Sequence, residues 1–264
     1  MDISRFRIES TREKLWFIRN KPKETFWFLR NRPKRILFDH LPKCAGSEIN
    51  NYVKTHLFPH MVFHTSQVTE KNHELFKSFP QKKRYRFRFV TGHFADELIE
   101  YIHPKTLTAT VFREPVDRLI SHYYYVKRTE IHYLYKKVTE NNLSLLEYIS
   151  SDLSDELRNW YTTHFTGLSI EEAEKNPEKS VELAFQKIVS RYDLVGFQDD
   201  LIAFIENLRK MARLRNPYAT TNENKTEKRP KLDDISEAVR LKIADINFLD
   251  ISLYQKLKEH FKSS

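Results

Sequence analysis

Residues 36–47 read ILFDHLPKCAGS, and this stretch decides the fold of the chain. Its first five residues begin with three apolar side chains and predict a short buried strand, and residues 41–47 predict a tight loop of small residues. The next residues predict a helix, because apolar and aromatic side chains recur on one helical face: Ile49, Tyr52, Val53, His56 and Leu57. Strand, loop and helix in this order are the repeating unit of an α/β domain.

The same alternation continues along the chain. Further strands are predicted at 84–89, where Tyr85, Phe87 and Phe89 alternate with arginines, and at 108–112 and 193–197. Helices are predicted at 116–124, 157–165, 199–213 and 236–261, and a polar loop at 214–234. Strands separated by helices predict a three-layer α/β domain with a mainly parallel central sheet. Ligands then bind beyond the carboxyl ends of the strands. We assign residues 35–264 to this domain and 1–34 to an N-terminal arm.

Charge and composition separate the arm from the domain. The chain has 264 residues, 40% of them hydrophobic, and a net charge of +9. Residues 1–35 carry +7 of this charge and the other 229 residues +2, so a body that coats nucleic acid is not expected. One cysteine excludes a disulfide framework and a cysteine-rich zinc site. No apolar run approaches the ~20 residues of a membrane span. The first 30 residues lack the apolar stretch of a secretory signal, so we expect a cytoplasmic protein.

The arm contains an internal repeat. Residues 16–23, WFIRNKPK, recur at 27–34 as WFLRNRPK. Aromatic rings next to basic side chains suit an anionic membrane surface, which predicts a peripheral contact with the inner face of a membrane. The same aromatics also suit packing against the body or a second subunit. The sequence leaves both interpretations open.

The loop at 42–47 has the properties of an anion site. Its backbone N–H groups precede a helix N-terminus, Lys43 adds a positive charge and Ser47 a hydroxyl donor. It is not a Walker A loop, because the lysine precedes Gly46 and GxxxxGK[ST] is absent. On this pattern alone, an ordinary connection between strand and helix is an equal alternative.

Two further motifs follow predicted strands. His93, after Thr91 and Gly92, is a candidate general base, although a single histidine is more often structural. Arg113 follows the strand at 108–112, with Ser121 eight residues later, and this pair is suited to clamp one phosphate group. The alternative for Arg113 is a salt bridge on a surface helix.

Together, these motifs resemble the carbohydrate sulfotransferases of the heparan sulfate 2-O-sulfotransferase type, in the second sulfotransferase family. The matching segments are Pro42–Glu48, Gly92–His93 and Arg113–Tyr123, read as PKCAGSE, GH and REPVDRLISHY. Two weaker matches are Asn159–Gly167 and Ile246–Tyr254. The resemblance spans residues 35–262 and leaves the arm outside.

The resemblance implies a P-loop-like domain that moves a sulfuryl group from 3′-phosphoadenosine 5′-phosphosulfate (PAPS) to a carbohydrate hydroxyl, releasing adenosine 3′,5′-bisphosphate (PAP). His93 and Lys43 are the implied catalytic residues. The implied donor-binding residues are Lys43, Cys44, Ala45, Gly46, Ser47, Glu48, Arg113, Ser121 and Lys225. No metal and no nucleic acid are expected, and the acceptor is a glycan or glycolipid.

The chain departs from the family pattern at three positions, which keeps an alternative open. Glu48 and Cys44 replace hydroxyl residues of the loop, and Thr91 replaces a first histidine. The alternative is a catalytically degenerate, sulfotransferase-like binding protein tethered to a membrane by the arm.

Two other patterns in the sequence concern glycan binding and zinc binding. Arg84, Arg86 and Arg88 form a face suited to an anionic glycan, or simply a solvated strand face. The histidines at 56, 60 and 64 have a spacing of four, but Pro59 interrupts the helix that would align them on a zinc ion.

Overall fold

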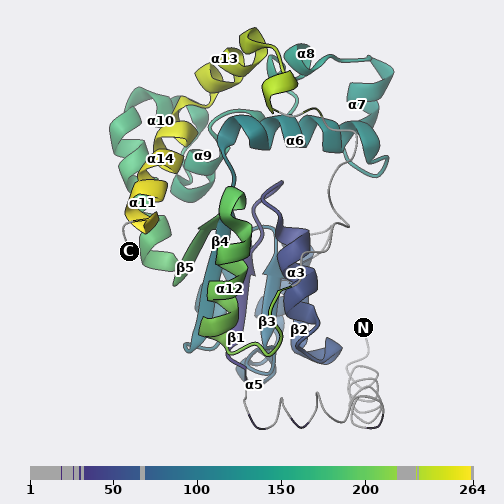
Figure 1. The fold of residues 1–264 in the computed structure, drawn as a ribbon, viewed down its shortest axis with the longest axis vertical. Helices are drawn as coiled ribbons and strands as arrows, with labels where there is room; N and C mark the ends of the chain where they lie inside the picture. The colour runs from purple at the N-terminus through teal and green to yellow at the C-terminus, as the bar shows by residue number, and fades with distance from the viewer. Residues whose placement is uncertain are drawn as a thin grey trace.

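A five-stranded, entirely parallel sheet forms the centre of the computed structural model (Figure 1). The structure describes Arg19, Phe26, Arg30, residues 33–65, 69–218, Pro230 and 232–262. The strands are β1 (Arg35–Asp39), β2 (Val62–Thr65), β3 (Phe89–Gly92), β4 (Thr106–Phe112) and β5 (Leu194–Phe197), in the order β2-β3-β1-β4-β5. The α/β class with a parallel central sheet, predicted from the sequence, is confirmed.

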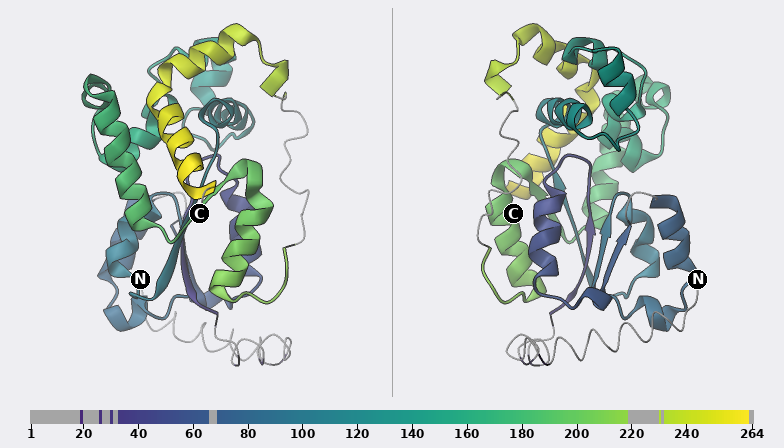
Figure 2. Two further views of the ribbon diagram at one scale, coloured as in Figure 1. Left: turned by 60° about the vertical axis from the view of Figure 1, so that its left-hand side comes forward. Right: turned by 90° about the vertical axis from the view of Figure 1, so that its right-hand side faces the viewer.

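Helices cover both faces of the sheet, and β1 has apolar side chains that are buried against helices on each face. Ile36 and Phe38 pack on α3 (Gly46–Lys54) and α12 (Leu201–Ala212), whereas Leu37 faces α4 (Thr69–Ser78) and η2 (Ala95–Tyr101). A strand that is buried on both faces reads as a continuous apolar run, as this one does. The two helical layers lie on opposite sides of the strands in Figure 2.

A group of helices lies over the carboxyl ends of the strands (Figure 1). One apolar cluster joins α6 (Pro115–Arg128), α7 (Tyr135–Glu140), α8 (Leu145–Ile149) and α13 (Glu237–Ile246). A second cluster packs α9 (Trp160–Thr166), α10 (Ile170–Lys175), α11 (Pro177–Arg191) and α14 (Phe248–Lys262) against β5. Short helical turns complete the described elements: α5 (Gln81–Arg84), η1 (Pro59–Met61), η3 (Asp155–Leu157), η4 (Gln198–Asp200) and η6 (Leu232–Asp234).

The prediction of a strand at 84–89 is wrong over most of that range. Arg84 ends α5, and β3 begins only at Phe89. The Arg84 guanidinium donates to three backbone carbonyls, those of Lys77, Phe79 and Tyr101, and so acts as a structural tie. Since Arg88 precedes β3, these arginines lie at the amino edge of the sheet, opposite the edge where ligands bind in such folds.

The single helix predicted at 236–261 is two helices. α13 ends at Ile246 and α14 begins at Phe248. Asn247 lies between them, where its side-chain amide donates to the carbonyls of Leu157 and Ile243. A side chain that bonds to backbone competes with a continuing helix, which accounts for the break.

Two of the predictions fall mainly on parts of the chain outside the described residues. Nearly all of the arm at 1–34, with its repeat, lies there, and so does Lys225 in the polar loop. Among the described residues, no helix is long and apolar enough to cross a membrane. The domain boundary and the membrane contact stay predictions.

Candidate active site

The loop after β1 combines two unusual backbone conformations with a helix start. Lys43 and Ala45 have φ of 66° and 63°, in the left-handed region that few non-glycine residues adopt. Such conformations recur in loops whose N–H groups gather around an anion, and strain of this kind concentrates at functional sites. α3 begins directly afterwards at Gly46, without a side-chain cap, and the first N–H groups of a helix have no intrahelical acceptor. The loop therefore offers backbone donors, the helix dipole and a lysine to one anion.

Gly46 is required by the close approach of a histidine. A Cβ at this position would lie 1.8 Å from Cδ2 of His40. The His40 ring packs between Phe38 and His93, at centroid distances of 6.2 and 4.6 Å. A side chain at Gly46 would push His40 out of this stack. The glycine thus serves packing behind the loop.

Cys44 turns its side chain into the core. The thiol is 1% exposed and lies 3.1 Å from the Tyr161 hydroxyl, and burial raises its pKa. The Cys44 N–H donates to the Leu41 carbonyl at 3.3 Å. Cys44 therefore shapes the loop from behind. Ser47 is exposed on the first turn of α3, and the neighbouring Glu48 N–H donates to Ala45 O at 3.1 Å.

Arg113 joins the third motif to the first. Its Nη1 donates to the Lys43 carbonyl at 3.0 Å, and its Nε donates to Asp117 at 2.5 Å. Its backbone N–H and carbonyl both bond to the Tyr161 hydroxyl, at 3.2 and 3.0 Å. Ser121 lies one turn beyond Asp117 on the same face of α6. The structure therefore brings the lysine loop and the arginine motif together, and it also contains the salt bridge to Asp117 that was the alternative interpretation of Arg113.

The second motif is held against the first by hydrogen bonds. His93 Nδ1 lies 2.6 Å from the His40 carbonyl oxygen. Only a protonated nitrogen can donate to a carbonyl, so the neutral ring carries its hydrogen on Nδ1 and leaves a lone pair on Nε2. Burial lowers the pKa of His93, which keeps the ring neutral near pH 7. His93 thus has the tautomer and the protonation state of a general base.

Gly92, before His93, permits the β2–β3 pairing. Its φ is 144°, and a Cβ would lie 1.8 Å from Thr65 Oγ1 and 2.6 Å from the Thr65 carbonyl oxygen. The absence of a side chain at Gly92 therefore makes room for the backbone and the side chain of Thr65. Thr91, where the family has a first histidine, is buried and donates to Asn50 at 2.7 Å.

Side chains from the overlying helices approach Lys43 and His93. The Lys43 ammonium lies 3.6 Å from the centroid of the Tyr125 ring on α6. Burial lowers the pKa of His93, and the nearby Glu156 carboxylate opposes part of this lowering. The same carboxylate lies 3.3 Å from His122 Nε2. These contacts join segments more than 30 residues apart, and no pattern in the sequence pointed to Tyr125 or Glu156.

The two weaker motifs, at Asn159–Gly167 and Ile246–Tyr254, contact one another behind the candidate active site. Asn159 N–H donates to Asn247 Oδ1, and Leu249 N–H donates to Asn159 Oδ1, both at 3.0 Å. Buried Asp250 accepts from the N–H groups of Tyr161 and Thr162, at 2.9 and 2.8 Å. This Asp250 cap fixes the start of α9 and with it Tyr161, which supports both Cys44 and Arg113.

The histidines at 56, 60 and 64 do not form a metal centre. His56 follows α3, His60 belongs to η1 and His64 to β2. His56 Nε2 accepts from the Asn216 N–H at 3.2 Å. Within the described ranges, the metal-ligand geometry of three side chains occurs at a different place, formed by Asp39, Asp96 and His164.

Comparison with known families agrees with the geometry. The family model described as "Sulfotransferase family" matches residues 27–256, which is most of the chain. The protein therefore belongs to the sulfotransferase family, and its fold and class of reaction, sulfuryl transfer, follow from that membership. No curated protein matches the sequence.

Proposed function

We propose that the protein transfers the sulfuryl group of PAPS to a hydroxyl of a carbohydrate acceptor, in the manner of the heparan sulfate 2-O-sulfotransferase type. The observation that carries this proposal is the convergence of three motifs at one edge of the sheet. Arg113 bonds to the Lys43 carbonyl, and His93 bonds to the His40 carbonyl three residues before Lys43. The loop with Lys43, the Arg113 guanidinium and the His93 imidazole thus lie close together, which supports the roles proposed for them.

The residues fit the two ends of this donor. The N–H groups at the start of α3, together with Lys43 and Ser47, would bind the 5′-phosphosulfate. Arg113 and Ser121 would bind the 3′-phosphate, the group that distinguishes PAPS from ATP and GTP. Glu48 places a carboxylate on the first turn of α3, where it is stabilised by the helix dipole and opposes a bound anion.

The reaction can be written with the chain's own groups. The acceptor oxygen forms a bond to sulfur while the bridging bond from sulfur to the 5′-phosphate oxygen breaks. His93 Nε2 takes the acceptor proton, and the Glu156 carboxylate stabilises the imidazolium that results. Lys43 and the N–H groups of α3 stabilise the negative charge that develops on the leaving phosphate. Lys43 would leave the Tyr125 ring to do so.

The acceptor is proposed to approach from the side of the overlying helices. The tyrosine and histidine rings there, Tyr125, His132 and Tyr133, pack on one another at centroid distances of 4.7 to 5.6 Å. Aromatic rings of this kind suit the apolar face of a sugar. The arginines at 84, 86 and 88 lie at the amino edge of the sheet, on the opposite side from the candidate active site. The proposed acceptor surface therefore does not include them.

Calorimetry with two nucleotides tests the donor assignment. PAP should bind at least about tenfold more tightly than AMP, since a hydrogen bond to a charged group contributes ~1.5–3 kcal/mol. Arg113→Ala should abolish the preference while leaving AMP binding nearly unchanged. Equal affinity for PAP and AMP in the unmodified protein would refute PAPS as donor.

A transfer assay tests the acceptor class. Radiolabelled PAPS is incubated with the protein and a panel of glycans and lipid extracts. Label on a glycan or glycolipid supports the proposal. Tight PAP binding with no transfer to any acceptor would support the degenerate binding protein instead.

A further inference from the structure

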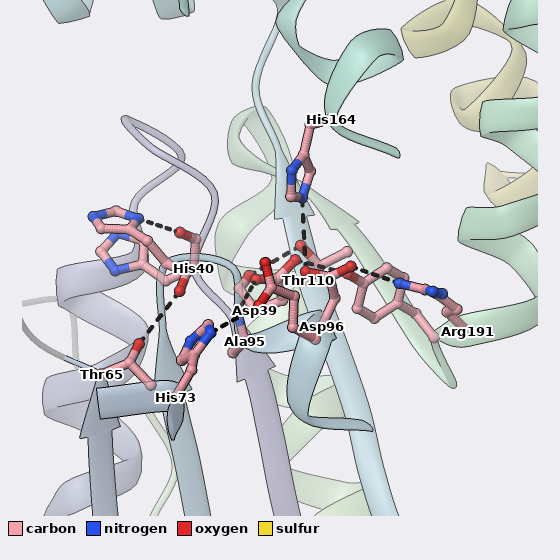
Figure 3. A network of polar contacts seen from close by, with 12 residues as sticks. Asp39, His40, Thr65, His73, Ala95, Asp96, Thr110, His164 and Arg191 are labelled. Atoms are coloured by element: carbon pink, nitrogen blue, oxygen red, sulfur yellow. Dashed lines mark hydrogen bonds and ion pairs between the residues drawn. The ribbon is translucent and has the colours of Figure 1, made fainter. Parts of the chain in front are cut away.

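Three potential metal ligands converge beside the candidate active site (Figure 3). Asp39 ends β1, Asp96 lies in η2 and His164 lies in α9. One ligand atom from each residue falls within 4.8 Å of the other two. All three side chains are largely buried, with exposed fractions of 9% for His164, 8% for Asp96 and 0% for Asp39.

Two polar atoms of this cluster lack a hydrogen bond. Among the described residues, neither His164 Nε2 nor Asp96 Oδ1 has a partner, although both atoms are buried. They face each other at 3.8 Å, which is too long for a hydrogen bond. Buried polar groups nearly always have a hydrogen-bond partner. Two facing polar atoms without one therefore indicate a ligand that binds between them.

The histidine ring is fixed in this direction by its neighbours. It stacks on Trp160, with centroids 5.0 Å apart and an interplanar angle of 6°. Phe94 and Phe165 contact it edge-on, at 5.1 and 4.7 Å. The aromatic cage leaves Nε2 directed at Asp96, as Figure 3 shows.

The carboxylates are also oriented from outside. Arg191 Nη1 donates to Asp96 Oδ2 at 2.6 Å, and Tyr192 donates to Asp39 Oδ2 at 2.7 Å. The Ala95 N–H donates to Asp39 Oδ1 at 3.0 Å. Outer hydrogen bonds that hold carboxylate ligands in place are usual around protein metal ions.

We propose that Asp39, Asp96 and His164 bind one divalent transition-metal ion of the zinc class. Two carboxylates and an imidazole are a ligand set that zinc accepts, with a fourth position left for water. Asp96 and Glu97 bring negative charge to His164, and Arg191 and Lys187 bring positive charge. Burial and the neighbouring Asp96 raise the pKa of Asp39 to about 8, so a cation that binds here near pH 7 displaces a proton from this carboxyl group.

The ion would link three elements that carry the active site. Asp39 directly precedes His40, and Asp96 follows His93 by three residues. An ion here would fix the ends of β1 and β3 relative to α9 without contacting donor or acceptor. The proposal goes beyond the sulfuryl-transfer function and does not depend on it.

Zinc titration of the chelator-treated full-length protein tests the site. We expect one equivalent of Zn²⁺ in calorimetry, a higher Tm with zinc, and visible absorption bands from Co²⁺ bound in its place. His164→Ala should weaken this binding at least tenfold and remove the bands. His103→Ala is the matched control, since His103 lies before β4 at the amino edge of the sheet, and it should bind like wild type.

Two results would overturn the proposal. One is the absence of stoichiometric binding by the wild-type protein. The other is a His164→Ala protein that binds Zn²⁺ and Co²⁺ as wild type does. If His164→Ala fails to fold, His164→Gln, which is closer in size and polarity, takes its place. Unchanged Co²⁺ bands in that variant would refute the assignment equally.

Discussion

Replacing His93 tests the catalytic assignment most directly. His93→Ala removes the Nε2 lone pair that would accept the acceptor proton, and His93→Asn removes it while keeping an N–H near the position of Nδ1 that can donate to the His40 carbonyl. Loss of a positioned base reduces turnover by ~10²–10⁴-fold. At 1.36 kcal/mol per tenfold change, this corresponds to about 3–5 kcal/mol of transition-state stabilisation.

The fold should change much less. The hydrogen bond from Nδ1 to His40 O contributes on the order of 0.5–1.5 kcal/mol to stability, and only the alanine variant loses it. We therefore expect both variants to bind PAP with nearly wild-type affinity. His103→Ala is the control and should turn over normally.

The pH profile provides an independent readout. Burial holds the pKa of His93 below its ordinary 6.5, so the base is neutral above that pKa and becomes protonated as the pH falls through it. The wild-type rate should fall on the acidic side of pH 6.5, and the variants should lose this limb. Turnover of His93→Asn within a few-fold of wild type would show that another group is the base.

Three further changes separate the roles of the loop and the arm. Lys43→Ala should lower turnover by ~10²–10³-fold in a transfer assay with Tm nearly unchanged, because its ammonium acts on the leaving phosphate; wild-type turnover would make the loop structural. Glu48→Gln should tighten PAP binding about two- to fivefold and lower Tm slightly, since one charge opposes the ligand and favours the helix dipole; calorimetry that shows weaker binding would contradict this. Removal of residues 1–30 should leave PAP binding unchanged and abolish salt-sensitive binding to anionic vesicles, with neutral vesicles as control. An unfolded body after truncation would place the arm's aromatics in the core.

The sequence was most informative where function depends on local order along the chain. The strand, loop and helix around Lys43 were predicted because apolar period and small residues specify them locally. Arg113 was placed correctly because it ends an apolar strand. The sheet order and its entirely parallel pairing needed the structure, since β2 is only four residues long.

Predictions failed where distant groups decide the local structure. The alternation at 84–89 is typical of a strand, yet Arg84 bonds to three carbonyls and ends a helical turn. Asn247 breaks a helix because of the carbonyl of Leu157, 90 residues earlier. Tyr161 was predicted only as part of a helical face and of the weaker match at Asn159–Gly167, and nothing in the sequence pointed to its contacts with Cys44 and Arg113. Such roles depend on contacts across the fold, which a pattern of neighbours does not encode.

The Asp250 cap on α9 has a consequence for the order of folding during synthesis. Tyr161 is held in place by an aspartate that the ribosome adds 89 residues later. A nascent chain that has already completed all five strands still lacks the support behind Cys44 and Arg113. We therefore expect nucleotide to stabilise the growing chain only after α14 has left the exit tunnel and Asp250 has capped α9.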